Sequence, residues 1–446
     1  MRVAEVCCGA GGMSLGLRRA GMEIAAAYDI WPEALAVYRD NFPRKPTLLR
    51  PPPGFRGHHA RSSDLGDLLR FVPTLMPMTI DLIAGGPPCQ DFSRAGRGEE
   101  GDRANMTVAF AMLIAVIRPE WLLFENVQDA VRSTAWKRAR LILQRAGYGL
   151  SEMKLDASQH GTGQKRTRFI VVGRLGEIDG FLNTVLEKPK KAPRTSVRDI
   201  LGDDVGVHPG GGYPEETRAY FMRPFKGGQG VRSIDEPCPT IIRSARDRAS
   251  DGYVPHKKDL APADSVPSLS WQQLAELQGF PASWNWSGAK TVRDRDIMIA
   301  NALPAPLAES IGRAILARHK GDSVPELESG FIGWLMAEKG YAGATFRNRC
   351  SQVNRARRLL KGRIFANVDT ELAMLQRTKE FVRLNTTVRS DLLGALSLHA
   401  EWRTSLRPSV ELDIDDFDDG ENRSAPVLRS LSERLGARSV TVDVEG

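Results

Sequence analysis

Residues 4–17 read Ala4-Glu5-Val6-Cys7-Cys8-Gly9-Ala10-Gly11-Gly12-Met13-Ser14-Leu15-Gly16-Leu17. The apolar start is typical of a buried strand, the glycines of a tight turn, and the residues that follow of a helix. Gly9, Gly11 and Gly12 can adopt positive φ and let a ligand approach the backbone closely. Strand, glycine turn and helix in this order predict the first unit of a parallel α/β sheet, with a ligand at the carboxyl ends of its strands.

The next unit along the chain ends in an acidic residue. Residues 24–29 read as a second strand, and the carboxylate of Asp29 at its end can accept hydrogen bonds from ribose hydroxyls. Farther on, Asp64 can face an adenine base if Leu65 stacks below it. The alternative is a plain strand–helix turn with a solvated aspartate. Taken together, the three features predict a nucleoside cofactor without a pyrophosphate.

The composition sets broad limits on what the protein is. A chain of 446 residues, 41% hydrophobic and 26% charged, is long enough for two or three globular domains. A net charge of +8 favours a polyanionic partner. Five cysteines without zinc-ligand spacing predict neither a disulfide framework nor a bound metal. Because no apolar run is long enough to cross a bilayer and the start lacks a signal-peptide pattern, we expect a cytoplasmic, nucleoid-associated protein.

A second informative stretch is the loop 84–93, Ala84-Gly85-Gly86-Pro87-Pro88-Cys89-Gln90-Asp91-Phe92-Ser93. It follows the apolar segment 80–83 and is too rich in Gly and Pro for a helix or a central strand. A thiol at the end of a buried strand is well placed to act as a nucleophile. Most free cysteines, however, are small buried hydrophobes, so Cys89 alone leaves both interpretations open.

Two more polar clusters occur where apolar strands begin or end. Residues 121–127 form a buried strand that ends in Glu125 and Asn126, and burial of a carboxyl group raises its pKa. Residues 164–168 lead into the apolar strand 169–173. Arg166 and Arg168 alternate and therefore share a face, which suits an anion or a base carbonyl. A cysteine, a glutamate and two arginines at successive strand ends indicate an active site.

The blocks, taken in order, resemble the DNA (cytosine-5) methyltransferase family over roughly the first 320 residues. No single block is specific, but an ordered set of seven is. The blocks are Gly9-Ala10-Gly11-Gly12, Asp29, Pro87-Pro88-Cys89-Gln90, Glu125-Asn126-Val127, Gln164-x-Arg166-x-Arg168, Glu276-Leu277-Gln278-Gly279-Phe280-Pro281 and Ile299-Ala300-Asn301-Ala302-Leu303-Pro304.

The resemblance implies a fold and a reaction. The fold is α/β, a doubly wound Rossmann-like methyltransferase domain with a small target-recognition domain, here followed by a C-terminal helical extension. The Cys89 thiolate would attack carbon 6 of a flipped-out cytosine, so that carbon 5 becomes electron-rich and accepts a methyl group. Glu125 would hydrogen-bond the ring, and Arg168 would bind the base carbonyl or the backbone. Arg166 would support the loop and Glu125, and the glycine-rich, charged loop 94–103 would close over DNA as a lid.

The resemblance also implies ligands. The cofactor would be S-adenosyl-L-methionine, bound by Cys7, Gly9, Gly11, Gly12, Asp29, Ile30, Asp64, Pro87 and Asn301. Duplex DNA would contact Gln90, Ser93, Arg97, Gln164 and Thr240. The sequence departs from the family pattern at Cys7, where an aromatic residue is usual, and at Ala300, where glycine is usual. Neither departure touches the thiol, the glutamate or the arginines, so we expect activity.

The predicted domains follow from the same comparison. Residues 1–174 would form the catalytic domain, 175–293 the target-recognition domain, and 294–320 a return segment that completes the catalytic domain. Residues 325–405 read as a helical accessory domain, because Phe331, Trp334 and Leu335 recur at helical spacing. Residues 406–446 read as an acidic, disordered tail that contains Asp413-Ile414-Asp415-Asp416-Phe417-Asp418-Asp419.

Two alternatives to DNA methylation remain open at this stage. The same chemistry could act on RNA, or the chain could be a DNA-binding regulator that has lost catalysis. The intact cysteine, glutamate and arginines argue against the second alternative. The resemblance further implies a monomer whose functional partner is a cognate restriction endonuclease.

Overall fold

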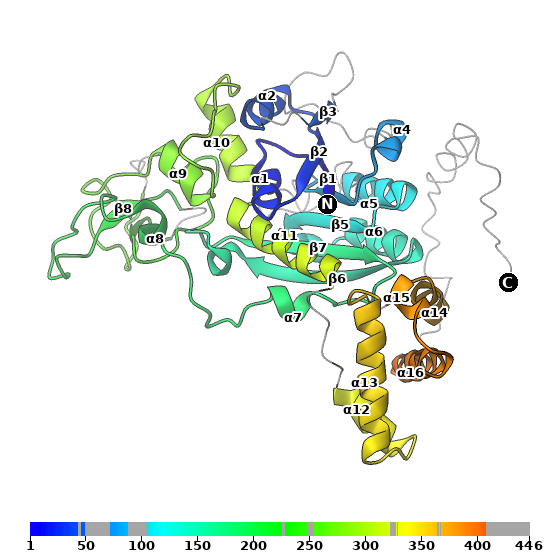
Figure 1. The fold of residues 1–446 in the computed structure, drawn as a ribbon. Helices are drawn as coiled ribbons and strands as arrows, with labels where there is room; N and C mark the ends of the chain where they lie inside the picture. The colour runs from blue at the N-terminus through cyan, green and yellow to red at the C-terminus, as the bar shows by residue number, and fades with distance from the viewer. Residues whose placement is uncertain are drawn as a thin grey trace. The chain divides into compact units, whose positions relative to one another are not determined.

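The computed structural model describes residues 1–42, 46–49, 72–87, 105–224, 228–247, 253–321, 327, 329–363, 365 and 367–406. Their main feature is a seven-stranded sheet with the order β3-β2-β1-β4-β5-β7-β6 (Figure 1). Strands β1 to β5 run parallel, whereas β7 runs antiparallel to both β5 and β6. The strands are β1 (Arg2–Val6), β2 (Glu23–Tyr28), β3 (Thr47–Leu49), β4 (Leu82–Gly85), β5 (Trp121–Val127), β6 (Tyr148–Asp156) and β7 (Thr167–Leu175).

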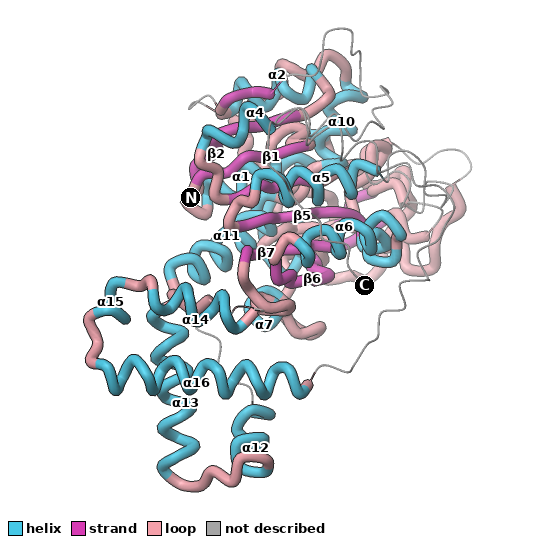
Figure 2. The backbone as a smooth tube through the Cα atoms, turned by 90° about the vertical axis from the view of Figure 1, so that its right-hand side faces the viewer, coloured by secondary structure: helices cyan, strands magenta, loops and turns pink. Residues whose placement is uncertain are grey.

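The central strands are apolar on both faces, as expected when helices cover both sides of a sheet. All four residues of β4 are buried, and so are the first four of β5. Figure 2 shows the strands one above the other from β2 to β6. The helices around them are α1 (Gly12–Arg19), α2 (Pro32–Asn41), α4 (Val72–Leu75), α5 (Asn105–Ile117), α6 (Thr134–Arg145) and α11 (Ala305–Lys320).

Helices α1 and α11 pack on each other although almost 300 residues separate them in the sequence. A Cβ atom on Gly16 would lie 2.3 Å from the carbonyl oxygen of Ala305, so only glycine permits this approach. The segment that follows residue 293 therefore returns to the first domain, as the sequence analysis predicts for 294–320. The doubly wound α/β fold class is confirmed.

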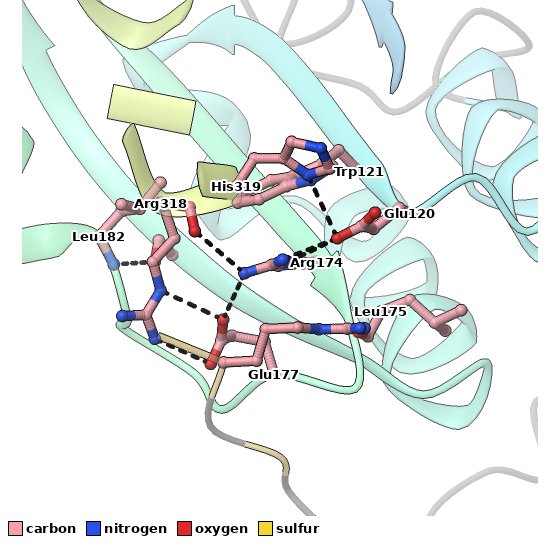
Figure 3. Close-up of polar contacts among 10 residues, drawn as sticks. Glu120, Trp121, Arg174, Leu175, Glu177, Leu182, Arg318 and His319 are labelled. Atoms are coloured by element: carbon pink, nitrogen blue, oxygen red, sulfur yellow. Dashed lines mark hydrogen bonds and ion pairs between the residues drawn. The ribbon is translucent and has the colours of Figure 1, made fainter. Parts of the chain in front are cut away.

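The carboxyl end of α11 is held by a buried ion network that was not predicted from the sequence (Figure 3). Arg174, near the end of β7, lies 2.7 Å from Glu120 and 3.7 Å from Glu177. Arg318 of α11 lies 3.1 Å from Glu177, and the side chains of Arg318 and Glu177 are 1% and 0% exposed. Burial of these charges is tolerated because each has an opposite charge beside it. The network ties the return helix to the sheet.

Between residues 175 and 293 the elements are short. They are α7 (Asn183–Leu186), α8 (Val197–Leu201), β8 (Ala219–Phe221), β9 (Val231–Ser233) and α9 (Trp271–Leu277), and α10 (Val292–Asn301) follows. Strands β8 and β9 form a small antiparallel sheet of their own. Its core contains Phe221 and Val231, which pack with Val266.

Beyond residue 328 the described secondary structure consists of helices joined by short turns. The helices are α12 (Ser329–Ala337), α13 (Ala344–Leu359), α14 (Val368–Gln376), α15 (Lys379–Val382) and α16 (Thr386–Ser405). Phe331 and Leu335 are both fully buried, which confirms the helical spacing noted for α12. The chain divides into two compact units, Met1–Ser397 and Leu398–Gly446, and the division falls within α16. The five domain boundaries given above remain predictions. None of the described helices is long and apolar enough to span a bilayer.

Candidate active site

The glycine turn connects β1 to α1 and is hydrogen-bonded to the carboxyl end of β2 and to Asp29 beyond it. Gly9 donates its N–H to the Asp29 carboxylate at 2.7 Å, and Trp31 donates its N–H to the other oxygen at 2.9 Å. Cys7, Gly9 and Gly11 all have positive φ, of 57°, 53° and 93°. A Cβ on Gly9 would meet no atom within 4 Å, so the space above the turn is open. The turn is thus a rigid backbone cradle next to a carboxylate.

The return segment closes one side of this cradle. A Cβ atom on Gly12 would lie 2.5 Å from the carbonyl oxygen of Leu303. Asn301, two residues earlier, is exposed at the end of α10. Ile30 follows Asp29 and is half-buried. These contacts bring the first and last sequence blocks of the predicted cofactor site to one place.

The buried carboxyl group of Glu5 lies near the glycine turn, and no role was predicted for it from the sequence. Glu5 of β1 is 2% exposed and accepts a hydrogen bond from the Ser14 hydroxyl. The Ser14 hydroxyl in turn lies 2.6 Å from the Tyr38 hydroxyl. Burial raises the pKa of Glu5 to about 8, with a smaller contribution from the nearby Asp29 charge. The signal available in the sequence was a charged residue inside an apolar strand.

The base of the cysteine loop is fixed against β5. Asn126 donates its side-chain N–H to the carbonyl oxygen of Pro87 at 3.3 Å, and its own amide oxygen accepts from the Val127 N–H at 2.8 Å. A Cβ on Gly86 would lie 2.7 Å from Glu125 Oε2, so glycine lets the loop begin directly beside that carboxyl group. The predicted site residues Asp64, Cys89, Gln90, Ser93 and Arg97, and the predicted lid 94–103, lie outside the described residues.

Glu125 and Arg168 form an ion pair across β5 and β7. Arg168 Nε lies 3.0 Å from Glu125 Oε1, and each side chain is 12% exposed. The antiparallel register places Val127 opposite Arg168, so the arginine reaches back along β5 to the glutamate. Burial raises the pKa of Glu125, although the Arg168 and Arg166 charges oppose the shift. The site therefore holds a carboxyl group whose pKa lies above its ordinary value.

Arg166 lies deeper, at 2% exposure, and binds backbone carbonyls from two other segments. It donates to the carbonyl of Ala300 at 2.7 Å and to that of Ile241 at 3.4 Å. The sequence predicted only that Arg166 supports the loop and Glu125, whereas in the structure its guanidinium contacts these two carbonyls. This arginine connects the start of β7 to α10 and to the segment around Ile241.

Two buried glutamines extend the same connection. Gln164 donates to the side-chain oxygen of Gln278 at 2.9 Å and accepts from the Ile241 N–H at 2.8 Å. Gln278 donates to the carbonyl of Ile299 at 2.6 Å. Gln164, predicted as a DNA contact, is fully buried, and so is Gln278. Gln278 belongs to one of the seven blocks, but no role was predicted for it. A polar residue between Leu277 and Gly279 could have indicated a buried hydrogen-bonding role.

A pocket of about 410 Å³ opens beside the ion pair. Thr240 lies at its edge and donates its hydroxyl to the Lys165 carbonyl at 3.0 Å. Arg168 is the member of the ion pair that lines it. The lining residues are Val127, Gln128, Asp129, Lys165, Thr167, Arg168, Pro239 and Thr240.

The other cysteines are poor nucleophiles. Burial raises the pKa of the Cys7, Cys8 and Cys238 thiols, and it also raises that of Cys350. A thiol with a raised pKa carries little thiolate at neutral pH. Cys89, the fifth cysteine of the chain, lies outside the described residues. Among the described residues, no group of three or more His, Cys, Asp or Glu is placed to hold a metal ion.

Residues 1–317 match a family model described as C-5 cytosine-specific DNA methylase. The type II methyltransferase M.HindV of Haemophilus influenzae is 34% identical over 319 residues, which cover 71% of this chain and 96% of the relative. M.HgiDI of Herpetosiphon aurantiacus is also 34% identical, with 71% and 94% covered. The solved methyltransferase EhMeth of Entamoeba histolytica has 15% identity and a TM-score of 0.50 over 72% of this chain and 99% of its own, which supports the fold alone.

Proposed function

Because this chain belongs to the C-5 cytosine-specific DNA methylase family and is a DNA (cytosine-5) methyltransferase, we propose that the pocket beside Glu125 and Arg168 is its active site. Family membership favours this activity over the RNA-modifying and regulatory alternatives. The observation that carries the assignment is the position of Glu125 against Gly86, three residues before Cys89. That position puts a carboxyl group next to the loop that bears the thiol.

The methyl donor in this proposal is S-adenosylmethionine, and the residues at the glycine turn fit it. The open space over Gly9 can receive a ligand, the Asp29 carboxylate can accept ribose hydroxyls, and Ile30 offers an apolar surface for a purine. When bound, the cofactor supplies an electrophilic methyl group. Gly11, Gly12, Cys7, Pro87 and Asn301 would complete the cradle, together with Asp64.

The reaction itself would depend on three side chains of this protein. The Cys89 thiolate adds to carbon 6 of cytosine, and the ring becomes an enamine whose carbon 5 is nucleophilic. Glu125, with its raised pKa, donates its proton toward ring N3 and so withdraws electrons as the thiolate adds. Arg168 orients Glu125 and binds the base carbonyl. After methyl transfer the proton on carbon 5 leaves to a base, and the thiolate is expelled.

The DNA partner is a short duplex site, and the protein acts as a monomer in the nucleoid. A cytosine inside a duplex must be extruded before Cys89 can reach it. Gln90, Ser93, Arg97 and Thr240 would contact that DNA, whereas the buried Gln164 would position the segment that carries Thr240. The relatives M.HindV and M.HgiDI are type II methyltransferases, which supports a role beside a cognate restriction endonuclease.

Bisulfite sequencing of a host genome tests this function. The protein is expressed in a host that lacks cytosine methylation, with Cys89→Ser as the matched control. Methylcytosine confined to one short motif, and absent from the Cys89→Ser strain, is the expected result. Equal absence of methylcytosine in both strains, with folded and cofactor-binding protein, would contradict the proposal.

A further inference from the structure

The helical region beyond the family match carries an unusual charge distribution. From Lys339 to Val368 the sequence contains eight lysines and arginines and no aspartate or glutamate. Most of this stretch is helix α13, which has five arginines. An ordinary solvated helix carries charges of both signs on its exposed side. A stretch of one sign over thirty residues therefore favours a partner of the opposite sign.

The charges of α13 are gathered on its exposed side. Arg349 is paired with Asp391 at 4.0 Å and Arg357 is buried, whereas Arg347, Arg355 and Arg358 are exposed. At about 100° per residue these three arginines fall within an arc of about 80° on the helix surface. Along the axis they span roughly 16 Å.

The opposite side of α13 is apolar and packed. Val353 and Ala356 are fully buried, and Leu360 is 4% exposed. The arginine face is therefore held in one orientation, because burial of the other side fixes the rotation of the helix.

The end of α13 is joined to the catalytic domain. Arg363 donates to the carbonyl of Leu175 at 2.9 Å, and a Cβ on Gly176 would lie 2.5 Å from the Phe365 ring. Leu175 is the last residue of β7 and lies where the parallel strands begin, whereas the glycine turn lies where they end. The ion network of Figure 3 lies beside Leu175. The arginine face of α13 is thus carried by the catalytic domain but is separate from the active site.

We propose that Arg347, Arg355 and Arg358 form a second DNA-binding surface that grips the phosphate backbone of duplex DNA away from the target cytosine. The inference rests on the proposed function only in taking duplex DNA as the substrate polymer. Exposed arginines neutralise phosphates and release counterions, which gives affinity without sequence selectivity. Since the surface lies apart from the active site, it contributes to binding of long DNA and leaves the chemical step unchanged.

The test compares two triple variants of the full chain. In the first, Arg347→Gln, Arg355→Gln and Arg358→Gln neutralise the α13 face. In the matched control, Lys137→Gln, Arg138→Gln and Arg145→Gln remove three exposed charges from α6. Binding to a long duplex without the target motif is measured by fluorescence anisotropy between about 50 and 200 mM salt, a range over which phosphate contacts dominate affinity. Methyl transfer to a short target duplex at saturating concentration is measured in parallel.

The α13 variant should bind the long duplex about tenfold or more weakly at low salt, with a salt slope smaller by about 2 to 3, as expected for three lost phosphate contacts. Its methyl transfer to the short duplex, and the DNA binding of the α6 control, should match the wild type. Equal affinity and slope for the two triple variants would overturn the proposal. Failure of the proposed function is seen separately, as absence of methyl transfer by the wild type.

Discussion

At the scale of single residues, the proposed chemistry depends most on Glu125. Its carboxyl group lies 3.0 Å from a guanidinium, which favours the charged form, yet burial is the larger effect and raises the pKa. The sequence predicted this direction from the position of a glutamate at the end of an apolar strand. It could not identify which arginine touches the carboxyl group, because that depends on the antiparallel register of β5 with β7.

Replacement of Glu125 tests its role as a proton donor. Glu125→Gln keeps the size and one hydrogen-bond donor but cannot release a proton, so single-turnover methyl transfer should fall by about 10² to 10³. Rapid-quench assays with labelled cofactor measure the rate. Glu152→Gln is the matched control, since Glu152 also pairs with an arginine, at 2.7 Å from Arg140, outside the site. A Glu125→Gln rate within threefold of the control would be incompatible with this role.

Glu5 makes a prediction about stability and pH. Its folded pKa of about 8 exceeds the unfolded value of 4.5, so the native state binds a proton that the unfolded state releases. Stability from this group is complete below pH 4.5 and is lost as the pH rises toward 8. The free energy of unfolding should fall by up to about 1.4 kcal/mol per pH unit in that window. Urea unfolding of wild type and Glu5→Gln at several pH values measures this slope, which should flatten in the variant; identical slopes would exclude a protonated Glu5.

At the scale of elements, the hydrogen bonds of Gln164, Gln278 and Arg166 connect the start of β7 to α9, to α10 and to the segment around Ile241. In the sequence, Gln164 and Arg166 belong to one block and Gln278 to another, so their order could be predicted but not their contacts. Their side chains meet because the return segment folds back over α1, a packing that depends on Gly12 and Gly16. Long-range packing of this kind leaves no local periodicity in the sequence.

A double-mutant cycle measures the energetic coupling between Gln164 and Gln278. Gln278→Leu alone removes the acceptor of the Gln164 side-chain N–H and the side-chain donor to the Ile299 carbonyl, and should cost about 1 to 3 kcal/mol of stability. Gln164→Leu should cost a similar amount, since it removes the acceptor of the Ile241 N–H and the donor to the Gln278 side-chain oxygen. The double variant should cost less than the sum by about 0.5 kcal/mol or more, because the two side chains are in contact. Additive costs in chemical denaturation would mean that the two glutamines act independently.

At the scale of the whole molecule, the sequence predicted the doubly wound domain and the return of the chain to it from seven ordered blocks. The region 175–293 could not be predicted in detail, because its elements are three to seven residues long and show no clear periodicity. The ion network under α11 was also missed. Arg174, Glu177 and Arg318 are ordinary charged residues in the sequence, and only the fold makes them a buried group.

The ion network predicts that two glutamates, each paired with an arginine of α11, contribute unequally to the free energy of unfolding. Glu177→Ala leaves two buried arginines without their shared carboxylate and should destabilise the protein by about 3 to 5 kcal/mol. Glu309→Ala, which removes the 2.6 Å pair with the exposed Arg313, should cost no more than about 1 kcal/mol. Thermal and urea unfolding of both variants provide the comparison. Similar losses from the two variants would show that the buried network does not fasten α11.

The central claim is that Cys89 bonds covalently to cytosine in DNA. The most direct measurement is mass spectrometry of the protein after reaction with S-adenosylmethionine and a duplex carrying 5-fluorocytosine at the motif found by bisulfite sequencing. Fluorine cannot leave carbon 5 as a proton does, so the adduct should persist, map to the peptide that contains Cys89, and be absent from Cys89→Ser. No adduct, or an adduct on Cys7, Cys8, Cys238 or Cys350, would contradict the account.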